Sequence, residues 1–312
     1  MRYYFAPMEG LTDRIYRQTH HAFFPGLDRY YMPFFSPTEH RSLTPREERE
    51  LPPADSISYC AIPQVMTKVA EDFLWAAEQC AQRGYQEINL NCGCPSGTVV
   101  AKKKGAGMLS DPDALDRFLD AIFTRCVLPI SVKTRLGMEN PEEFPRLLEV
   151  FNRYPIQELT IHPRVRKAFY AGEPDMEMFR YAYTHSRNPL CYNGNLFSLE
   201  DIAAFSREFP DIESVMLGRG LIGCPDLFCP TDVATLENFF NTLLEAYTAN
   251  FGGARNAMFR MKEHWGLLLP HFDDSEKLGK QLRKTTDIQE FRSITKQILH
   301  TLPMAKELQP TW

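Results

Sequence analysis

The sequence predicts an α/β protein: a (β/α)8 TIM barrel followed by a C-terminal all-helical domain. Short apolar runs that end in turn residues recur eight times before residue 218, and amphipathic helical patterns separate most of them. Strands that alternate with helices over roughly 230 residues match the size of a barrel of eight parallel strands. After Pro230 the strand signals stop and only helical periodicity remains. A doubly wound open sheet is the structural alternative.

The predicted strands are short and end at turn residues, as in barrels of this size. In chain order they are 3–8, 29–32, 63–66, 87–91, 130–135, 158–162, 190–192 and 214–217. The fourth, EINLN, alternates apolar and polar residues and stops at Gly93, which is typical of a strand that leads into a turn. The segment 36–56 is rich in Pro, Glu and Arg and predicts a solvated loop or an insertion.

Helix signals accompany the strands and continue to the end of the chain. The second barrel helix has Asp111 as its N-cap and Pro112 at its first position, an arrangement that favours helix initiation. Predicted helices span 70–84, 112–125, 199–209, 233–247, 254–269, 275–284 and 288–299. The predicted domains are therefore a barrel over 1–235 and a helical domain over 236–312.

Composition excludes several classes of protein. With 312 residues, 44% hydrophobic and 24% charged, wholesale disorder is excluded. The sequence contains no apolar run of about 18 residues and no signal-peptide core at its N-terminus, so we expect a cytoplasmic protein without a membrane partner. Its eight cysteines form no matched CxxC pairs, which argues against a disulfide scaffold or a metal site.

The net charge of −5 is unevenly distributed. Residues 240–312 carry ten Lys and Arg against eight Asp and Glu, so the tail is mildly basic on an acidic body. The difference in charge either arises by chance or indicates that the tail binds a polyanion.

Polar residues gather at the carboxyl ends of the predicted strands, where barrels place their sites. These ends carry Ala6, Pro7 and Met8; Gln64; Asn91; Lys133 and Arg135; His162 and Arg164; Asn193, Gly194 and Asn195; and Gly218 and Arg219. The glycines and the arginine of the last two turns predict a phosphate site. The spacing of Gly218–Gly223 also fits a dinucleotide fingerprint, but it follows the last strand rather than the first, which argues against that interpretation.

Two residues at these ends have distinctive chemistry. Lys133 either reaches solvent or directs its charge at an electron-rich ring or a developing anion. Cys94 lies on the turn between Gly93 and Pro95, over the mouth of the predicted barrel. A thiol with an ordinary pKa of about 8.5 can donate a proton at neutral pH, and a nearby cation would instead make it a nucleophile. The run 102–104 of three lysines is either solvated or part of a glycine-hinged lid for an anionic substrate.

At these residues the sequence resembles the tRNA-dihydrouridine synthase family. The resemblance covers nearly the whole chain, and its most specific motif is the Asn-x-Gly-Cys-Pro turn at 91–95 followed by the Gly-Ala stretch at 105–107. The matching motifs are APMEGLTD at 6–13, INLNCGCPSGTVV at 88–100, GAGML at 105–109, KTRLG at 133–137, IHPR at 161–164, NGN at 193–195, LGRG at 217–220 and the basic-aromatic stretch at 260–265.

The resemblance implies a flavoenzyme that reduces the C5=C6 bond of specific uridines in tRNA, with FMN as cofactor and NADPH as electron donor. FMN N5 would pass a hydride to C6, and Cys94 would give the proton to C5. The implied FMN-binding residues are Ala6, Pro7, Met8, Gln64, Lys133, His162, Asn193, Gly194, Asn195, Gly218 and Arg219. The implied tRNA-binding residues are Asn91, Lys102, Arg164, Arg260 and Lys262. We expect a monomer whose partner is tRNA.

Two alternatives remain open at this point. The first is an FMN barrel dehydrogenase that acts on a small molecule, similar to dihydroorotate dehydrogenase. The second is a non-catalytic RNA-binding protein on a barrel scaffold. The chain also departs from the family pattern: Pro163 follows His162 where Gly or Ala is more usual, and Phe34 and Phe35 follow Pro33 where an acidic residue is common.

Overall fold

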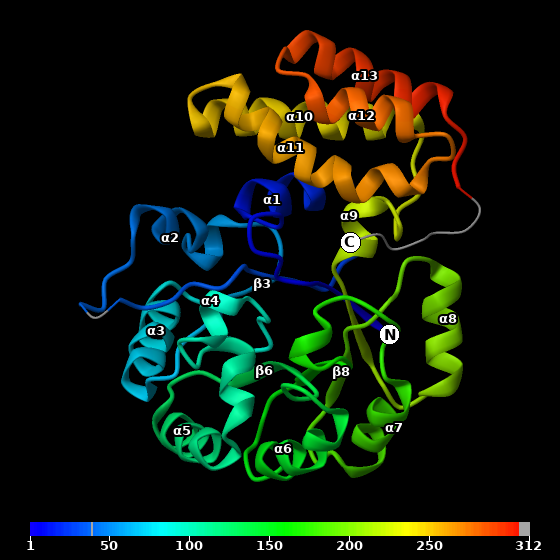
Figure 1. The fold of residues 1–312 in the computed structure, drawn as a ribbon. Coiled ribbons are helices and arrows are strands. Elements are labelled where there is room, and N and C mark those ends of the chain that lie inside the picture. The colour runs from blue at the N-terminus through cyan, green and yellow to red at the C-terminus, as the bar shows by residue number, and fades with distance from the viewer. Residues whose placement is uncertain (39, 306–312) are drawn as a thin grey trace. The chain divides into compact units, whose positions relative to one another are not determined.

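A computed structural model describes residues 1–38 and 40–305. Its strands form one sheet with the order β3-β2-β1-β9-β8-β7-β6-β5-β4 (Figure 1). The strands are β1 (Arg2–Phe5), β2 (Arg29–Tyr31), β3 (Ala61–Ile62), β4 (Gln64–Val65), β5 (Ile88–Cys92), β6 (Ile130–Arg135), β7 (Leu159–His162), β8 (Leu190–Tyr192) and β9 (Ser214–Leu217). Strands that follow one another in the chain lie side by side and run parallel, which is the order of a barrel and not of a doubly wound sheet.

The barrel closes at Pro63. This proline separates β3, which pairs with β2, from β4, which pairs with β5. Proline has no N–H to donate to the ladder, so it divides what is otherwise one strand. Its carbonyl still accepts from the N–H of Asn89 at 2.9 Å. The predicted eight strands are thus confirmed, with the third divided in two, and the open-sheet alternative is wrong.

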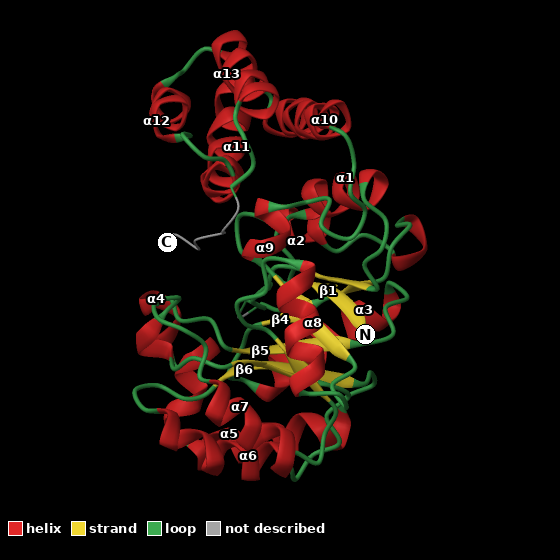
Figure 2. Cartoon of the chain, turned by 90° about the vertical axis from the view of Figure 1, so that its right-hand side faces the viewer, coloured by secondary structure: helices red, strands yellow, loops and turns green. Residues whose placement is uncertain are grey.

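Helices alternate with the strands along the chain, and further helices follow the last strand (Figure 2). They are α1 (Arg14–Phe23), α2 (Pro45–Glu50), α3 (Ala70–Gln82), α4 (Gly97–Val100), α5 (Pro112–Arg125), α6 (Phe144–Phe151), α7 (Met176–His185), α8 (Leu199–Glu208), α9 (Arg219–Gly223), α10 (Val233–Phe251), α11 (Ala254–Leu268), α12 (Glu276–Lys284) and α13 (Ile288–Thr301). The helices that the sequence predicts are present, with ends within a few residues. Among the described residues, no helix has the length and apolar character needed to cross a membrane.

The segment 36–56, predicted to be a solvated loop or an insertion, contains the short helix α2. Thr44 and Glu47 form a reciprocal capping box, with the Glu47 carboxylate accepting from the Thr44 N–H at 2.8 Å. Pro45 at the first helical position adds to this local signal. The composition of the segment is that of a loop, but the cap is sufficient to initiate one short helix.

The chain divides into two compact units. The first comprises Met1–Pro7, Asp28–Asn195 and Ala204–Met216, and the second comprises Met8–Leu27, Leu196–Ala203 and Leu217–Trp312. In the second unit, α1 packs on α10, where the Tyr16 and Phe239 rings meet edge to face with centroids 5.9 Å apart. The predicted boundary at residues 235 and 236 stays a prediction.

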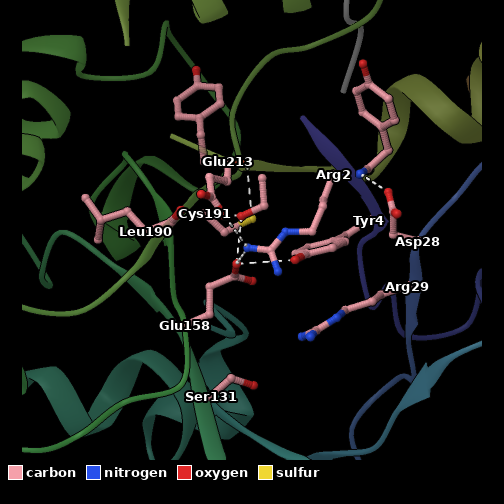
Figure 3. Close-up of polar contacts among 12 residues, drawn as sticks. Arg2, Tyr4, Asp28, Arg29, Ser131, Glu158, Leu190, Cys191 and Glu213 are labelled. Atoms are coloured by element: carbon pink, nitrogen blue, oxygen red, sulfur yellow. Dashed lines mark hydrogen bonds and ion pairs between the residues drawn. The ribbon is translucent and has the colours of Figure 1, made fainter. Parts of the chain in front are cut away.

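The interior of the first unit is unusually polar. At the amino ends of the strands, the buried Glu158 carboxylate accepts from the Tyr4 hydroxyl at 3.3 Å and from the Arg2 guanidinium at 3.4 Å (Figure 3). Arg29 pairs with the buried Glu87 at 2.8 Å. Burial raises the pKa of Glu158 because desolvation disfavours its charged form. This network occupies one end of the barrel and leaves the carboxyl ends of the strands for the site.

Candidate active site

A ladder of buried side-chain amides joins β4 to β5, from Asn89 near the amino end of β5 to Asn91 near its carboxyl end. Asn91 donates from Nδ2 to Oε1 of Gln64 at 2.8 Å, and Gln64 donates from Nε2 to Oδ1 of Asn89 at 2.8 Å. Asn89 donates in turn to the Ser131 hydroxyl at 2.9 Å. Because each amide in the ladder uses both its donor and its acceptor, no member can flip alone. The ladder brings together Gln64, predicted to bind the cofactor, and Asn91, predicted to place the base.

The Cys94 turn is built on the other end of the Asn91 side chain. Oδ1 of Asn91 accepts from the backbone N–H groups of Gly93 at 3.0 Å and Cys94 at 2.9 Å. On its outer side, the carbonyl of Cys94 accepts from the N–H of Ala106 at 3.1 Å. Gly105 has a φ of 54°, and a side chain there would place its Cβ 3.0 Å from the Cβ of Cys94. The glycine therefore allows the segment 105–110 to pack against the cysteine.

Two arginines hold the carbonyls on either side of Cys94. Arg135 donates from Nε to the carbonyl of Gly93 at 3.0 Å, and Arg166 donates from Nε to the carbonyl of Pro95 at 3.1 Å. From the sequence, Arg135 was expected at a strand end, but neither arginine was assigned a role at Cys94. A signal was available for Arg135, because it follows Lys133 by two residues and so points to the same face of the strand. No local signal existed for Arg166, which lies 71 residues from Pro95 in the chain.

Lys133 lies opposite Asn91 in the pairing of β5 and β6. Burial, with a smaller contribution from the Arg135 guanidinium, lowers the pKa of Lys133 to about 7. A lysine in this state gains from an anionic neighbour, which would restore its charged form. The lysine is therefore suited to stabilise negative charge on a bound group.

The loop after β7 is organised by the buried Arg164. Its guanidinium donates to the carbonyls of Ala171 at 3.3 Å and Gly172 at 2.5 Å, and to Oδ1 of Asn195 at 3.1 Å. It also lies 2.9 Å from Nε2 of His162. Since a guanidinium only donates, Nε2 of His162 is the acceptor in this contact. Arg164, predicted to bind tRNA, thus organises two residues that were predicted to bind the cofactor.

The turn after β8 is tightly packed. Asn193 donates from Nδ2 to the carbonyl of Met216 at 2.7 Å, which joins the ends of β8 and β9. A Cβ built on Gly194 would lie 1.9 Å from the hydroxyl oxygen of Tyr192, so a side chain cannot fit there without displacing that ring. Asn195 donates to the Glu173 carboxylate at 3.0 Å. Ala6 and Pro7 follow β1. Ala6 is buried, and Pro7 is the last residue of the segment Met1–Pro7 that belongs to the first unit.

The other predicted site residues at strand ends belong to the second unit. The carbonyl of Met8 accepts from the N–H of Thr12 at 3.0 Å. Gly218 is the N-cap of α9, and the Arg219 guanidinium lies 5.5 Å from the centre of the Phe197 ring. The predicted phosphate site that combines Gly218 and Arg219 with the turn 193–195 stays a prediction.

The residues predicted to bind tRNA are differently engaged. Lys102 is exposed, as is Lys103. Arg260 pairs with Glu263 at 2.9 Å. Lys262 donates from Nζ to the carbonyl of Arg283 at 3.1 Å and also to that of Thr285. Lys262 therefore caps the end of α12, which was not expected from the sequence. Desolvation lowers its pKa.

The predicted lid is only partly exposed. Residues 105–109 are buried in the 3-10 helix Gly105–Ser110, which is bonded to the Cys94 turn, whereas Lys102 and Lys103 are exposed. The glycine-hinged lid stays a prediction. Among the described residues, no group of His, Cys, Asp and Glu side chains is arranged to hold a metal ion.

Comparison with known proteins supplies the family. The model of the family described as dihydrouridine synthase (Dus) matches residues 4–308. The tRNA-dihydrouridine synthase B of Pasteurella multocida is 28% identical over 73% of this chain and 68% of its own. The tRNA-dihydrouridine(16) synthase of Neisseria meningitidis serogroup A is 25% identical over 77% of this chain and 76% of its own.

Solved structures show the same barrel fold. Morphinone reductase in complex with tetrahydroNAD has a TM-score of 0.51 to this chain at 12% identity, over 72% of this chain and 85% of that one. The fold, the strand-end residues and the family match agree with one another. The chain belongs to the dihydrouridine synthase family and is a flavin-dependent oxidoreductase.

Proposed function

We propose that this protein is a tRNA-dihydrouridine synthase that uses FMN and NADPH to reduce the C5=C6 bond of specific uridines in tRNA. The observation that carries the proposal is the Cys94 turn, because a thiol is held at a strand end beside Asn91 and Lys133 by hydrogen bonds on both flanking peptide groups. The names of the two relatives, both tRNA-dihydrouridine synthases, support the same substrate.

The residues of this chain suit FMN. Lys133 is a desolvated cation whose charged form an anionic flavin ring would restore. The amide ladder fixes the orientation of the Gln64 side chain, so its polar atoms would face the edge of a bound flavin ring in a single orientation. The small side chain of the buried Ala6 would let a flat group approach this strand end. The residues that would hold the ring are Ala6, Pro7, Met8, Gln64, Lys133 and His162. Asn193–Asn195 with Gly218 and Arg219 would hold the phosphate.

Each residue of the turn then has a chemical task. Bound FMN would supply the chemistry of hydride transfer to C6 of the uracil. Cys94 holds on Sγ the proton that C5 receives, and it is left as the thiolate. Asn91 keeps the turn in place through its two backbone contacts. Lys133 would hold the bound ring and would offset negative charge on it.

The substrate must carry its uridine out of the base stack to reach such a site. The exposed Lys102 and Lys103 offer cations to an RNA backbone. In the helical region, 236–312, Arg260 and Lys262 are the cations that we expect to contact tRNA. An acidic net charge is compatible with this function, because binding depends on local cations rather than on the whole surface.

An anaerobic half-reaction tests the proposal. The purified protein is expected to carry flavin, which NADPH reduces. After removal of excess NADPH, tRNA made without modifications should reoxidise the flavin, with one dihydrouridine formed per flavin. The same tRNA, already fully modified, serves as control and should leave the flavin reduced. If only a small unsaturated molecule reoxidises the flavin, the small-molecule dehydrogenase function replaces this proposal. If the protein binds no FMN, both functions are refuted.

A further inference from the structure

The loop after β7 presents an aromatic side chain to solvent from a strained backbone. Phe169 is 43% exposed and follows the 3-10 turn Arg166–Ala168. Its φ is 50°, in the left-handed region that bulky residues rarely adopt. Its carbonyl accepts from the Arg135 guanidinium at 2.6 Å, and its N–H donates to the carbonyl of Arg166 at 3.1 Å. The surrounding contacts thus hold the Phe169 backbone in an unfavourable conformation that leaves its ring at the surface.

An arginine covers part of this ring and connects it to the Cys94 turn. The Arg166 guanidinium carbon lies 5.0 Å from the centre of the Phe169 ring. The same guanidinium donates to the carbonyl of Pro95 at 3.1 Å, and Pro95 follows Cys94 directly. One side chain therefore separates the exposed ring from the residue that flanks the proposed proton donor.

The surroundings of the ring are cationic. Lys167 is exposed and pairs with Glu139 at 3.1 Å. Arg166 also approaches the start of α4, where a Cβ on Gly97 would lie 3.9 Å from its Nη2, and the exposed Lys102 and Lys103 follow that helix. An exposed aromatic face among cations is the combination that binds single-stranded nucleic acid, because bases stack on the ring while the cations meet the phosphates.

We propose that Phe169 and Arg166 form a stacking platform for an unpaired nucleobase of the RNA, namely one adjacent to the uridine that reacts. This inference rests on the proposed function and adds to it a specific contact with a nucleotide that is not modified. The platform makes no hydrogen bonds to base edges through Phe169, so it selects an unstacked conformation of the RNA rather than a particular base.

Phe169→Ala tests the platform through RNA affinity. The dissociation constant for unmodified tRNA should rise about 5- to 150-fold, the loss that removal of one base stack causes. Phe169→Trp retains an aromatic face and should bind nearly as wild type. Val127→Ala is the matched control, because Val127 is 61% exposed but precedes β6 at the opposite end of the strands. Flavin absorbance and thermal unfolding establish that each variant is folded.

A second measurement locates the contact on the RNA. tRNAs with an abasic nucleotide on the 5′ or the 3′ side of the target are bound to wild type and Phe169→Ala. One of them should abolish the difference between the two proteins, because the stack is already lost. Wild-type affinity in Phe169→Ala, or a loss that persists with both abasic RNAs, would overturn the platform and leave the proposed function standing. Failure of the wild type to bind and modify tRNA would overturn both.

Discussion

Replacing Asn91 by alanine tests whether one side chain holds the Cys94 turn. Asn91→Ala removes the acceptor of the Gly93 and Cys94 N–H groups and the donor to Gln64. Each such bond contributes about 0.5–1.5 kcal/mol, and a buried group left without a partner costs about 1–3 kcal/mol. Two of the freed groups are only partly buried, so the total loss is about 2–4 kcal/mol of unfolding free energy. In a protein of this size that lowers Tm by roughly 3–6 °C.

Urea unfolding measures this loss, and alkylation of Cys94, followed by peptide mass spectrometry, measures release of the turn. Asn188→Ala is the control, because Asn188 also uses both its amide donor and its amide acceptor. It donates to the Phe151 carbonyl at 3.0 Å and accepts from the Ile156 N–H at 3.1 Å, but it lies at the amino end of β8. It should lose stability without changing Cys94 alkylation. A loss below about 1 kcal/mol in Asn91→Ala, or alkylation of Cys94 at the wild-type rate, would show that the turn does not depend on Asn91.

Four further predictions follow from single contacts. Cys94→Ala should bind FMN and accept electrons from NADPH but form no dihydrouridine, as stopped-flow reduction and RNA analysis would show; full turnover would remove the thiol from the mechanism. The pKa of Lys133 is about 7, below its value in the unfolded chain, so between pH 7 and 10 the folded state binds fewer protons than the unfolded state. The unfolding free energy of the wild type should therefore rise over this pH range, and it should rise less in Lys133→Met. Gly194→Ala should lose about 1–3 kcal/mol in urea unfolding and weaken FMN binding, because its Cβ overlaps the Tyr192 hydroxyl; an unchanged midpoint would show that the ring moves aside. Lys262→Ala should lower Tm because the α12 cap is lost. It should also weaken tRNA binding and reduce, by about one, the slope of the logarithm of the binding constant against the logarithm of the salt concentration. An unchanged slope would show that Lys262 only caps the helix.

Several features of the fold could be predicted because their signals are local. The helix α5 begins where Asp111 accepts from the N–H of Ala114, and the sequence shows both this cap and the proline after it. Strand ends were predicted from turn residues, and the carboxyl ends of parallel strands necessarily gather at one end of a barrel. This is why Gln64, Asn91 and Lys133 could be placed at one site without a structure.

Other features depend on partners that lie far away in the chain. Nothing near Lys262 indicates that its ammonium caps α12, since the carbonyls that it binds are 21 and 23 residues away. Arg164 was predicted to meet RNA, and only the folded loop reveals that its donors are used on His162 and Asn195.

The sequence by itself determined the alternation of strands and helices, the helix caps and the set of chemical groups at the strand ends, because periodicity and capping act over a few residues. The tertiary structure decided how the barrel closes at Pro63, that Arg135 and Arg166 hold the peptide groups around Cys94, and that Phe169 is exposed on a strained backbone. These are contacts across tens of residues, and their energies depend on distance and burial in the folded chain rather than on neighbours in sequence.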